Sequence, residues 1–344
     1  MFCLCSDALA TQNAQTEVVN PMASLISRRS ALLGAIVAAG GGMRVARAAG
    51  EQPSTSVLPM AEQIEHSTVI IQCANAKGEI SSGTGFAFAL FRQNDQSVPV
   101  IVTNKHVVAG SVRGKLRWTL RTPDGAPDYG NFVDIEISNF ESAWIPHSDN
   151  NIDLTIFPCA PMLASLEKSG KAVFVIQIDQ SLVPTDVELR ELTPLEELVI
   201  VGYPDGIFDA KNNVPIFRRG ITATPAYLDF EGRKEFLIDA AIFPGSSGSP
   251  VFLYNQGAYA DRQGHLAIGG RMKLLGIVYA VALHDVNGEI RVIPAPTQAR
   301  QSVISPIPNN LGLCIKSSKV LDFEPLIVQR GFHPPDGYVM RSGG

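Results

Sequence analysis

The sequence predicts an all-β protein, and three observations carry this prediction. Short apolar runs of strand length recur from Thr68 onward, and clusters of Gly, Pro, Asn and Asp separate them. Glycine occurs 30 times and proline 23 times, as expected where many short strands are joined by turns. Charged residues make up 18% of the chain against 45% hydrophobic residues, so a sizeable core can form. This spacing of strands favours a barrel or sandwich over alternating β/α units.

The first half of the chain contains seven predicted strands, and turn-forming residues separate them. The stretches 122–125 and 127–130 each contain Pro, Asp and Gly and are typical turns. Segment 182–197 is more polar and contains prolines, so we expect it to link two halves. The predicted strands are 68–72, 85–90, 98–103, 116–120, 132–137, 154–157 and 173–178.

The second half repeats this pattern and ends in a predicted helix. Residues 317–326 form that helix, with Ser317 or Ser318 as its N-cap. The proline-rich segment 285–309 is predicted to be a long loop, and the Gly- and Pro-rich residues after Gly331 a tail. The predicted strands are 198–201, 216–223, 235–241, 250–254, 274–281 and 312–315.

Residues 1–48 are predicted to be an export signal rather than part of the fold. Arg28 and Arg29 form a twin-arginine pair before a short apolar run, and the Ala-Arg-Ala stretch at 46–48 offers a cleavage site. The apolar run is shorter than the roughly 20 residues that a membrane span needs, so a cleaved signal is favoured over a retained anchor. Because the segment before the arginines is long for such a signal, Met22 as well as Met1 is a candidate start.

Charge and cysteine content exclude several classes of function. The formal net charge is −5 and no Lys/Arg run exceeds two residues, so a nucleic-acid partner is not expected. Cys3 and Cys5 would leave with the signal. Cys73, Cys159 and Cys314 lie in or beside apolar strands and are expected to be buried free thiols, with a disulfide as the alternative. Their spacing fits no zinc pattern, and we expect neither a metal nor another cofactor.

The stretch Pro-Gly-Ser-Ser-Gly-Ser-Pro-Val-Phe at 244–252 is the strongest functional signal. Gly245 and Gly248 allow unusual backbone dihedrals, and the prolines at each end stiffen the turn. Such a turn can expose a serine hydroxyl and direct backbone N–H groups at one point, as an oxyanion hole requires. Taken alone, the string is equally compatible with a surface loop.

A nucleophilic serine needs a base, and the base needs an orienting carboxylate. Among six histidines, His106 stands out because it ends a strongly apolar strand. Asp153 directly precedes another apolar strand, whereas its competitor Asp149 lies in a polar loop. Ser247 is the middle candidate among the serines at 246, 247 and 249. The order His, Asp, Ser along the chain is that of the chymotrypsin triad and differs from the subtilisin and α/β-hydrolase orders.

On this order and on four further stretches, the chain resembles the chymotrypsin-like serine peptidases. The likeness is strongest to the bacterial branch that includes the periplasmic high-temperature-requirement proteases and the glutamyl endopeptidases. It extends over about residues 66–325. The further stretches are Ser-Gly-Thr-Gly-Phe at 82–86, Val-Gly-Tyr-Pro at 201–204, Leu-Gly-Ile-Val at 275–278 and Asn-Leu-Gly-Leu at 310–313.

The resemblance implies two antiparallel six-stranded β-barrels with the active site in the cleft between them, followed by a short C-terminal helix. The implied domains are residues 49–181 and 182–330, with a tail at 331–344. The resemblance also implies a serine endopeptidase in which Ser247 attacks the substrate, His106 moves the proton and Asp153 orients the imidazole. The backbone N–H groups of Gly245 and Ser247 would form the oxyanion hole.

The family's pattern also implies a specificity pocket. Its floor would be Ala241, and its walls Tyr279, Ala280, Val281 and Gly312. An uncharged floor favours small or medium apolar substrate side chains. The predicted loop 285–309 would lie near the cleft and gate access to it.

Substrate, location and two rival functions complete the expectations. The substrate would be a protein or peptide. The protein would be periplasmic or secreted, without stable membrane insertion once the signal is cleaved. The sequence does not determine the oligomeric state. A catalytically silent barrel that binds peptides or a partner, and an esterase that uses the same residues, remain open as alternatives.

Overall fold

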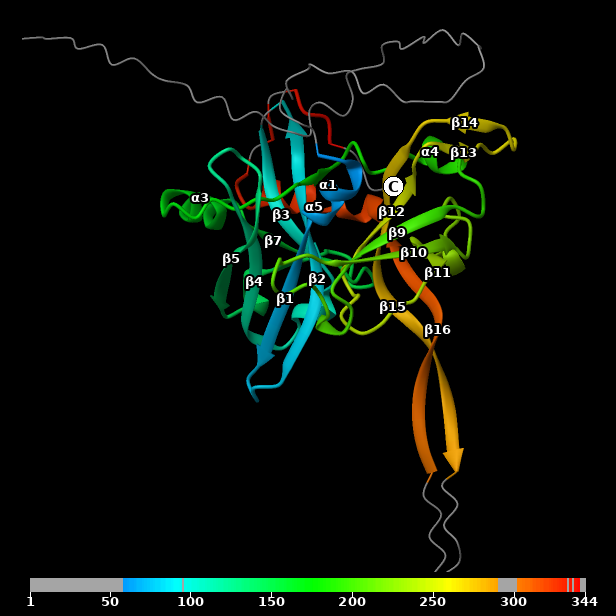
Figure 1. Ribbon diagram of the computed structural model, residues 1–344, viewed down its shortest axis with the longest axis horizontal. Helices are drawn as coiled ribbons and strands as arrows, with labels where there is room; N and C mark the ends of the chain where they lie inside the picture. Colours follow the sequence, from blue (N-terminus) through cyan, green and yellow to red (C-terminus); the bar gives the residue numbers. More distant parts are fainter. Residues whose placement is uncertain (1–57, 95, 290–301, 333, 336, 341–344) are drawn as a thin grey trace, which may run out of the picture. The chain divides into compact units, whose positions relative to one another are not determined.

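The computed structural model describes residues 58–94, 96–289, 302–332, 334–335 and 337–340, with side chains left out at 282–289 and 302–309 (Figure 1). The predicted export signal at 1–48, including both arginines and the alternative start, lies outside the described residues. Residues 59–344 form one compact unit. This unit is built mainly of strands, which confirms the all-β prediction.

The N-terminal half is an eight-stranded sheet. The strands lie in the order β5-β4-β1-β2-β3-β7-β6, and β8 pairs in parallel with β2. The resemblance implied a six-stranded antiparallel barrel in this half. The described sheet instead has eight strands, and one of its pairs, β2 with β8, is parallel. The strand β6 is two residues long, too short to produce an apolar run, and of the predicted strand 173–178 only residue 178 lies in a named strand, the two-residue β8. The bounds are β1 Thr68–Asn75, β2 Ile80–Gln93, β3 Gln96–Thr103, β4 Ser111–Arg121, β5 Pro127–Ser138, β6 Ile145–Pro146, β7 Thr155–Pro158 and β8 Ile178–Asp179.

The C-terminal half contains a closed barrel of six strands, as predicted. Its strands follow one another in the order β10-β11-β16-β15-β12-β9, and all neighbouring pairs are antiparallel. A separate pair, β13 and β14, projects beside it (Figure 1). The bounds are β9 Glu197–Gly202, β10 Ile216–Thr222, β11 Glu235–Asp239, β12 Pro250–Asn255, β13 Ala258–Ala260, β14 Leu266–Ile268, β15 Arg271–Glu289 and β16 Ser302–Lys316.

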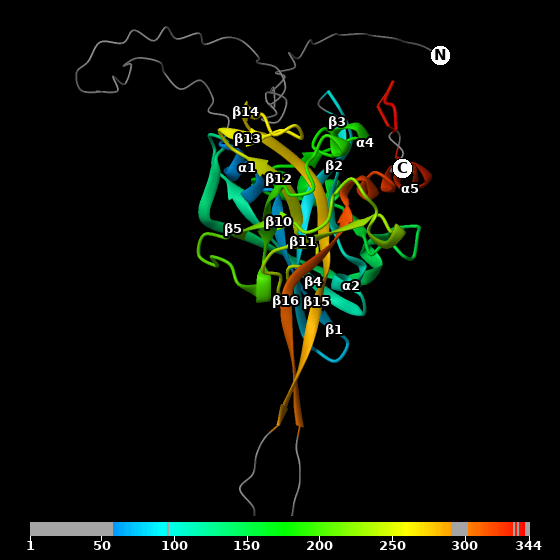
Figure 2. The same ribbon diagram turned by 90° about the vertical axis from the view of Figure 1, so that its right-hand side faces the viewer.

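The last two strands continue beyond the barrel as a two-stranded ribbon (Figures 1 and 2). Their register runs from Leu283 opposite Pro308 to Glu289 opposite Ser302. The prediction of a loop over 285–309 is therefore wrong for both ends of that segment. The prolines at 306 and 308 suggested a loop, but both strands of a two-stranded ribbon are edge strands, where a missing N–H is tolerated.

The helices are short and lie between or after the strands. The helix α4 occupies the predicted linker 182–197 and begins with a capping box in which Thr185 and Glu188 bond each other's backbone N–H groups. The predicted closing helix 317–326 is divided into η5 and α5. The bounds are α1 Met60–Glu65, α2 Lys105–Val108, α3 Ala160–Lys168, α4 Asp186–Arg190, α5 Phe323–Gln329, η2 Glu141–Ala143, η3 Pro204–Gly206, η4 Phe230–Gly232 and η5 Ser317–Val320.

One hydrophobic cluster joins the sheet to the barrel. Phe86 and Phe88 of β2 belong to it together with Val201 of β9 and Phe252 of β12, and all four are fully buried. Burial of apolar area on this scale contributes roughly 2 kcal/mol for each large side chain. The cluster therefore packs β2 against β9, which leads into the Gly-Tyr-Pro stretch, and against β12, which follows the serine turn at 244–250.

The described cysteines, Cys73, Cys159 and Cys314, are buried and free, as predicted. Burial raises the pKa of the Cys159 thiol to about 12 and that of Cys314 well above its ordinary value. The thiols of Cys159 and Cys314 are therefore protonated at neutral pH and serve as small apolar side chains.

The buried histidine His66 makes stability depend on pH. Its Nε2 lies 3.0 Å from the Tyr129 hydroxyl, which donates to Glu65 at 2.9 Å. Burial lowers the pKa of His66 from 6.5 to about 4. Between these values the unfolded chain binds a proton that the folded chain does not, so the free energy of unfolding falls as pH falls.

We expect this residue to remove about 2 kcal/mol of stability between pH 7 and pH 4.5. Urea unfolding at both pH values, for the protein and for His66→Gln, measures the effect. Burial raises the pKa of Glu65, which opposes the loss in acid, but the variant retains Glu65 and so isolates the histidine. An equal loss of stability in both proteins would contradict the assignment.

Candidate active site

The ends of two paired strands bring His106 and Asp153 together. Strands β3 and β7 are antiparallel, with Thr103 opposite Thr155. His106 follows the end of β3 in the one-turn helix α2, and Asp153 precedes the start of β7. The buried Asn104 fixes the junction, because its side-chain amide donates to the Asp153 carbonyl at 2.7 Å.

The carboxylate of Asp153 accepts two hydrogen bonds from His106. The backbone N–H of His106 donates to Oδ1 at 3.2 Å, and ring Nδ1 lies 2.5 Å from Oδ2. A carboxylate at this distance requires the proton on Nδ1, which leaves Nε2 as a proton acceptor. The ring is 49% exposed, so Nε2 can meet a substrate or a nucleophile.

Exposure separates the three serines of the turn 244–250. Ser246 and Ser249 are 2% and 1% exposed. The Ser246 hydroxyl accepts from the Phe243 N–H at 3.4 Å, whereas the Ser249 hydroxyl is enclosed. Ser247 is half-buried, and within the described part of the chain its hydroxyl makes no hydrogen bond. Ser247 is therefore the one of the three that a substrate can reach.

Backbone contacts bring the serine turn to β2 beside the strand that carries His106. The Ser247 carbonyl accepts from the Thr84 N–H at 2.9 Å. The Thr84 carbonyl in turn accepts from the Thr103 hydroxyl at 2.7 Å, at the end of β3. His106, Asp153 and Ser247 thus lie on segments that are distant in sequence but adjacent in the fold.

Two peptide groups of the turn direct their N–H groups outward. The Pro244 carbonyl accepts from Asp205 N–H at 2.5 Å, and the Ser246 carbonyl accepts from Ser249 N–H at 3.0 Å. A trans peptide holds its N–H opposite its carbonyl, so the next N–H groups, those of Gly245 and Ser247, point away from these partners. Neither donates to an acceptor among the described residues. These are the two donors that sequence reasoning assigned to an oxyanion hole.

The glycine at 245 is required by both conformation and space. Its φ is +82°, in the left-handed region. A Cβ at this position would lie 2.6 Å from the Tyr203 carbonyl oxygen. The turn therefore lies directly against the Gly-Tyr-Pro stretch that the sequence singled out.

The predicted pocket floor, Ala241, and its neighbour Ile242 differ in exposure. Ala241 is exposed, and its carbonyl accepts from Arg218, whose guanidinium lies 4.8 Å from the centre of the Phe243 ring. The neighbouring Ile242 is buried instead, and a Cβ on Gly312 would lie 2.9 Å from it. Sequence reasoning missed Ile242 and Arg218, although the apolar character of residue 242 was a signal for an inward side chain.

The predicted walls lie on β15 and β16. Val281 pairs with Gly312, while Tyr279 lies in an irregularity of β15 between Val278 and Ala280. All three wall residues from 279 to 281 are half-buried. Burial and the carboxylate of Glu235 raise the pKa of Tyr279, so its hydroxyl stays neutral.

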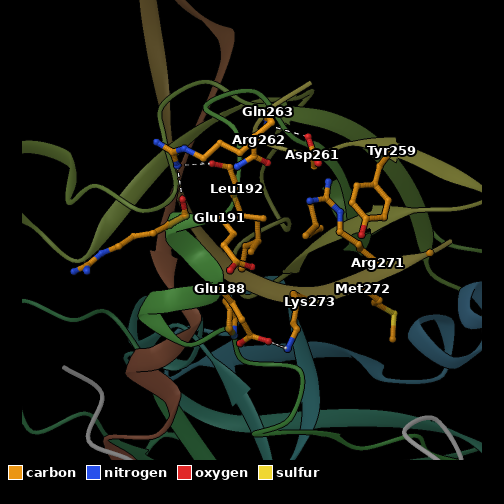
Figure 3. Close-up of a pocket in the computed structure, with 15 residues that line it drawn as sticks. Glu188, Glu191, Leu192, Tyr259, Asp261, Arg262, Gln263, Arg271, Met272 and Lys273 are labelled. Atoms are coloured by element: carbon orange, nitrogen blue, oxygen red, sulfur yellow. Dashed lines mark hydrogen bonds and ion pairs between the residues drawn. The ribbon is translucent and has the colours of Figure 1, made fainter. Parts of the chain in front are cut away.

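A cavity of about 560 Å³ lies elsewhere on the barrel, between α4, β13 and β15 (Figure 3). Lys273 pairs there with Glu188 at 2.6 Å, and Arg262 donates to the Leu192 carbonyl at 3.0 Å. None of the predicted catalytic, oxyanion-hole or pocket residues lines it. No helix in the described ranges is long and apolar enough to cross a membrane.

Comparison with solved structures gives distant similarities. The HtrA-type protease AlgW with tripeptide is 16% identical, with a TM-score of 0.40 over 79% of this chain. This chain covers 63% of the AlgW chain, which is less than two thirds. The active form of the Rv3671c protease from M. tuberculosis is 17% identical, with a TM-score of 0.39 over 88% of this chain and 98% of that one. The serine endoprotease from Yersinia pestis is 15% identical, with a TM-score of 0.38 over 80% of this chain and 69% of that one.

Comparison by sequence identifies the family. No curated protein matches the chain. The family model described as trypsin-like peptidase domain matches residues 83–259, about half of the chain. The matched region contains His106, Asp153 and Ser247. The chain belongs to the trypsin-like peptidase domain family.

Proposed function

We propose that the protein is a serine endopeptidase that hydrolyses peptide bonds through Ser247, His106 and Asp153. The observation that supports this best is the pair of hydrogen bonds from His106 to the two oxygens of Asp153. These bonds fix the imidazole with an unprotonated Nε2, the form that a general base requires. The accessible Ser247 follows as the nucleophile, because both neighbouring serines in its turn are buried.

The proposed reaction proceeds in two halves. Ser247 Oγ bonds to the peptide carbonyl carbon as its proton passes to His106 Nε2, and the carbonyl oxygen takes up negative charge. The N–H groups of Gly245 and Ser247 stabilise that oxyanion. His106 then protonates the amine as the C–N bond breaks, which leaves an acyl-enzyme. Water attacks the ester by the same proton transfers and regenerates Ser247.

The surroundings of residue 241 favour a substrate with a small or medium apolar side chain before the cleaved bond. Ile242 is buried against Gly312 and makes the lining apolar, and Val281 lies opposite Gly312 on the neighbouring strand. Residue 241 is an alanine, so no carboxylate at this position can pair with a substrate cation. We propose Ala241, Tyr279 and Ala280 as the remaining, more exposed contacts.

We also propose the division into residues 49–181 and 182–330, with a tail at 331–344, and export through a twin-arginine signal at 1–48. The six strands β9 to β12, β15 and β16 all lie within the second range, which supports its lower boundary. The arginine pair at 28 and 29 and the short apolar run after it support export. N-terminal sequencing of the exported protein tests the cleavage site after residue 48.

A fluorophosphonate probe tests the proposed chemistry, because it phosphonylates only an activated serine. We expect one probe per molecule, found on Ser247 by mass spectrometry of the digested protein. Labelling should stop when a peptide boronate occupies the site. A folded protein that takes up no probe would favour the catalytically silent peptide-binding barrel. Cleavage of simple esters without cleavage of any peptide library would favour the esterase.

A further inference from the structure

Every polar group of Thr84, in β2, makes a hydrogen bond to a segment near the serine turn at 244–250. Its side chain is completely buried. The hydroxyl accepts from the Tyr203 N–H at 3.0 Å and donates to the Gly245 carbonyl at 3.0 Å. The backbone N–H donates to the Ser247 carbonyl at 2.9 Å, and the backbone carbonyl accepts from the Thr103 hydroxyl at 2.7 Å. Thr84 thus contacts the serine turn, the Gly-Tyr-Pro stretch and the strand β3, which leads to His106.

These bonds hold the two residues whose N–H groups point outward. Thr84 binds the carbonyl of Gly245 through its hydroxyl and the carbonyl of Ser247 through its backbone. The peptide before Gly245 is held by Asp205, in the turn that Thr84 binds through Tyr203. Because peptide groups are planar, fixing the carbonyls on both sides of Gly245 fixes the direction of its N–H.

Close packing shows how little freedom this arrangement has. A Cβ on Gly248 would lie 1.9 Å from the Thr84 carbonyl oxygen, and a Cβ on Gly202 would lie 2.6 Å from the Thr84 hydroxyl oxygen. Both positions are glycine in motifs that the sequence singled out. The serine turn and the Gly-Tyr-Pro turn therefore approach Thr84 as closely as backbone allows.

Removal of the hydroxyl would leave two backbone groups without this partner, the buried Tyr203 N–H and the half-buried Gly245 carbonyl. The Tyr203 N–H and the Gly245 carbonyl each have Thr84 as their hydrogen-bond partner. A buried polar group without a partner is costly, so both segments would shift to find water or another group. A shift at Gly245 turns its N–H away from the place where the oxyanion forms.

We propose that Thr84 is a positioning residue that holds the oxyanion-hole N–H groups of Gly245 and Ser247 in their catalytic direction. The inference rests on the proposed peptidase function. It assigns the effect to the hydroxyl, so serine can replace Thr84 whereas valine of the same shape cannot. The hydroxyl does not touch the substrate and acts only through the turn.

The test compares Thr84→Val with Thr84→Ser in peptide hydrolysis. Thr84→Val should lower kcat by about 10- to 100-fold, somewhat less than outright loss of one oxyanion donor. KM should change by no more than about threefold, because the interaction matters in the transition state rather than in substrate binding. Thr84→Ser should restore kcat to within about threefold of the unaltered protein.

Thr222→Val is the matched control. Thr222 is 2% exposed, and its hydroxyl accepts from the Glu196 N–H at 2.8 Å and donates to the Pro194 carbonyl at 2.8 Å. It therefore makes the same two kinds of bond in a segment that contacts neither turn. Thr222→Val should lose stability like Thr84→Val but keep its kcat. If Thr84→Val does not fold, Thr84→Cys replaces it in the test. Because a thiol is a weaker hydrogen-bond donor than a hydroxyl, the kcat of Thr84→Cys should lie between that of Thr84→Ser and that expected for Thr84→Val.

Ligand affinities separate a positioning role from a merely structural one. A peptide boronate, which forms a tetrahedral adduct, should bind Thr84→Val more weakly by the same factor as kcat/KM falls. A peptide substrate should bind Ser247→Ala and the double variant Thr84→Val, Ser247→Ala with equal Kd. An unchanged kcat in Thr84→Val, or an equal loss in Thr222→Val, overturns the inference. If the unaltered protein neither cleaves peptides nor takes up the fluorophosphonate, the proposed function itself fails.

Discussion

Replacement of Ser247 with alanine is expected to lower kcat for peptide hydrolysis by about 10⁶-fold, the loss typical when a triad nucleophile is removed. The variant lacks the oxygen that bonds to the substrate carbonyl, and no acyl-enzyme can form. Ser246 and Ser249 cannot take its place, because both are buried and Gly248 holds the turn against Thr84. Initial rates on a cleavable peptide, with the melting temperature as a check on folding, measure the effect.

Ser249→Ala is the matched control for this variant. The Ser249 hydroxyl is buried and has no hydrogen-bond partner among the described residues, so its removal leaves none of their polar groups unpaired. Ser249→Ala should keep both the melting temperature and kcat, the latter within about threefold. Retention of substantial hydrolysis by a purified, folded Ser247→Ala protein would mean that another group attacks the substrate.

The ends of apolar strands were the most informative sequence signal for the site. His106 and Asp153 were selected because each adjoins such a strand, and β3 and β7 pair so that these ends meet. The sequence displays each apolar run directly, but β4, β5 and β6 lie between β3 and β7 along the chain, so their pairing is not a local signal. The six strands of the C-terminal barrel were likewise predicted from apolar runs, whereas their closure into a barrel was implied by the family resemblance.

The supporting contacts could not be predicted because they join distant parts of the chain. Thr84 contacts Tyr203 and Gly245, which are 119 and 161 residues away. A buried threonine inside an apolar strand has the same local pattern whether its hydroxyl bonds a turn or its own strand. The outward direction of the Gly245 N–H likewise depends on Asp205, and nothing near residue 245 encodes that partner.

Side-chain direction in the segment before Ser247 also escaped sequence reasoning. Counting from the nucleophile selected Ala241 as a pocket floor, which stays a prediction, but it did not predict that the neighbouring Ile242 is buried against Gly312. Successive residues of an extended chain face opposite sides, so an offset of one residue exchanges inside and outside. The bond from Arg218 to the Ala241 carbonyl involves a residue on a different strand, β10.

Replacement of Asp153 with asparagine is expected to lower kcat by about 10⁴-fold with little change in fold. The two oxygens of Asp153 accept from the backbone N–H and from ring Nδ1 of His106. An asparagine has one oxygen for these two donors, and its NH₂ group would face the other. If the NH₂ faces the ring, Nδ1 must become the acceptor and the proton moves to Nε2, which can then no longer accept the Ser247 proton.

Asp149→Asn is the control that distinguishes this effect from a general loss of charge. Asp149 lies in the same loop, and its Oδ1 accepts from the Asn151 backbone N–H at 2.9 Å. An asparagine oxygen can accept that same bond, so Asp149→Asn should keep kcat within about threefold. Steady-state rates at pH 8 compare the two variants. Equal losses in both would show that the loop needs its negative charge rather than a carboxylate against His106, whereas a loss confined to Asp153→Asn ties the rate to the tautomer of that ring.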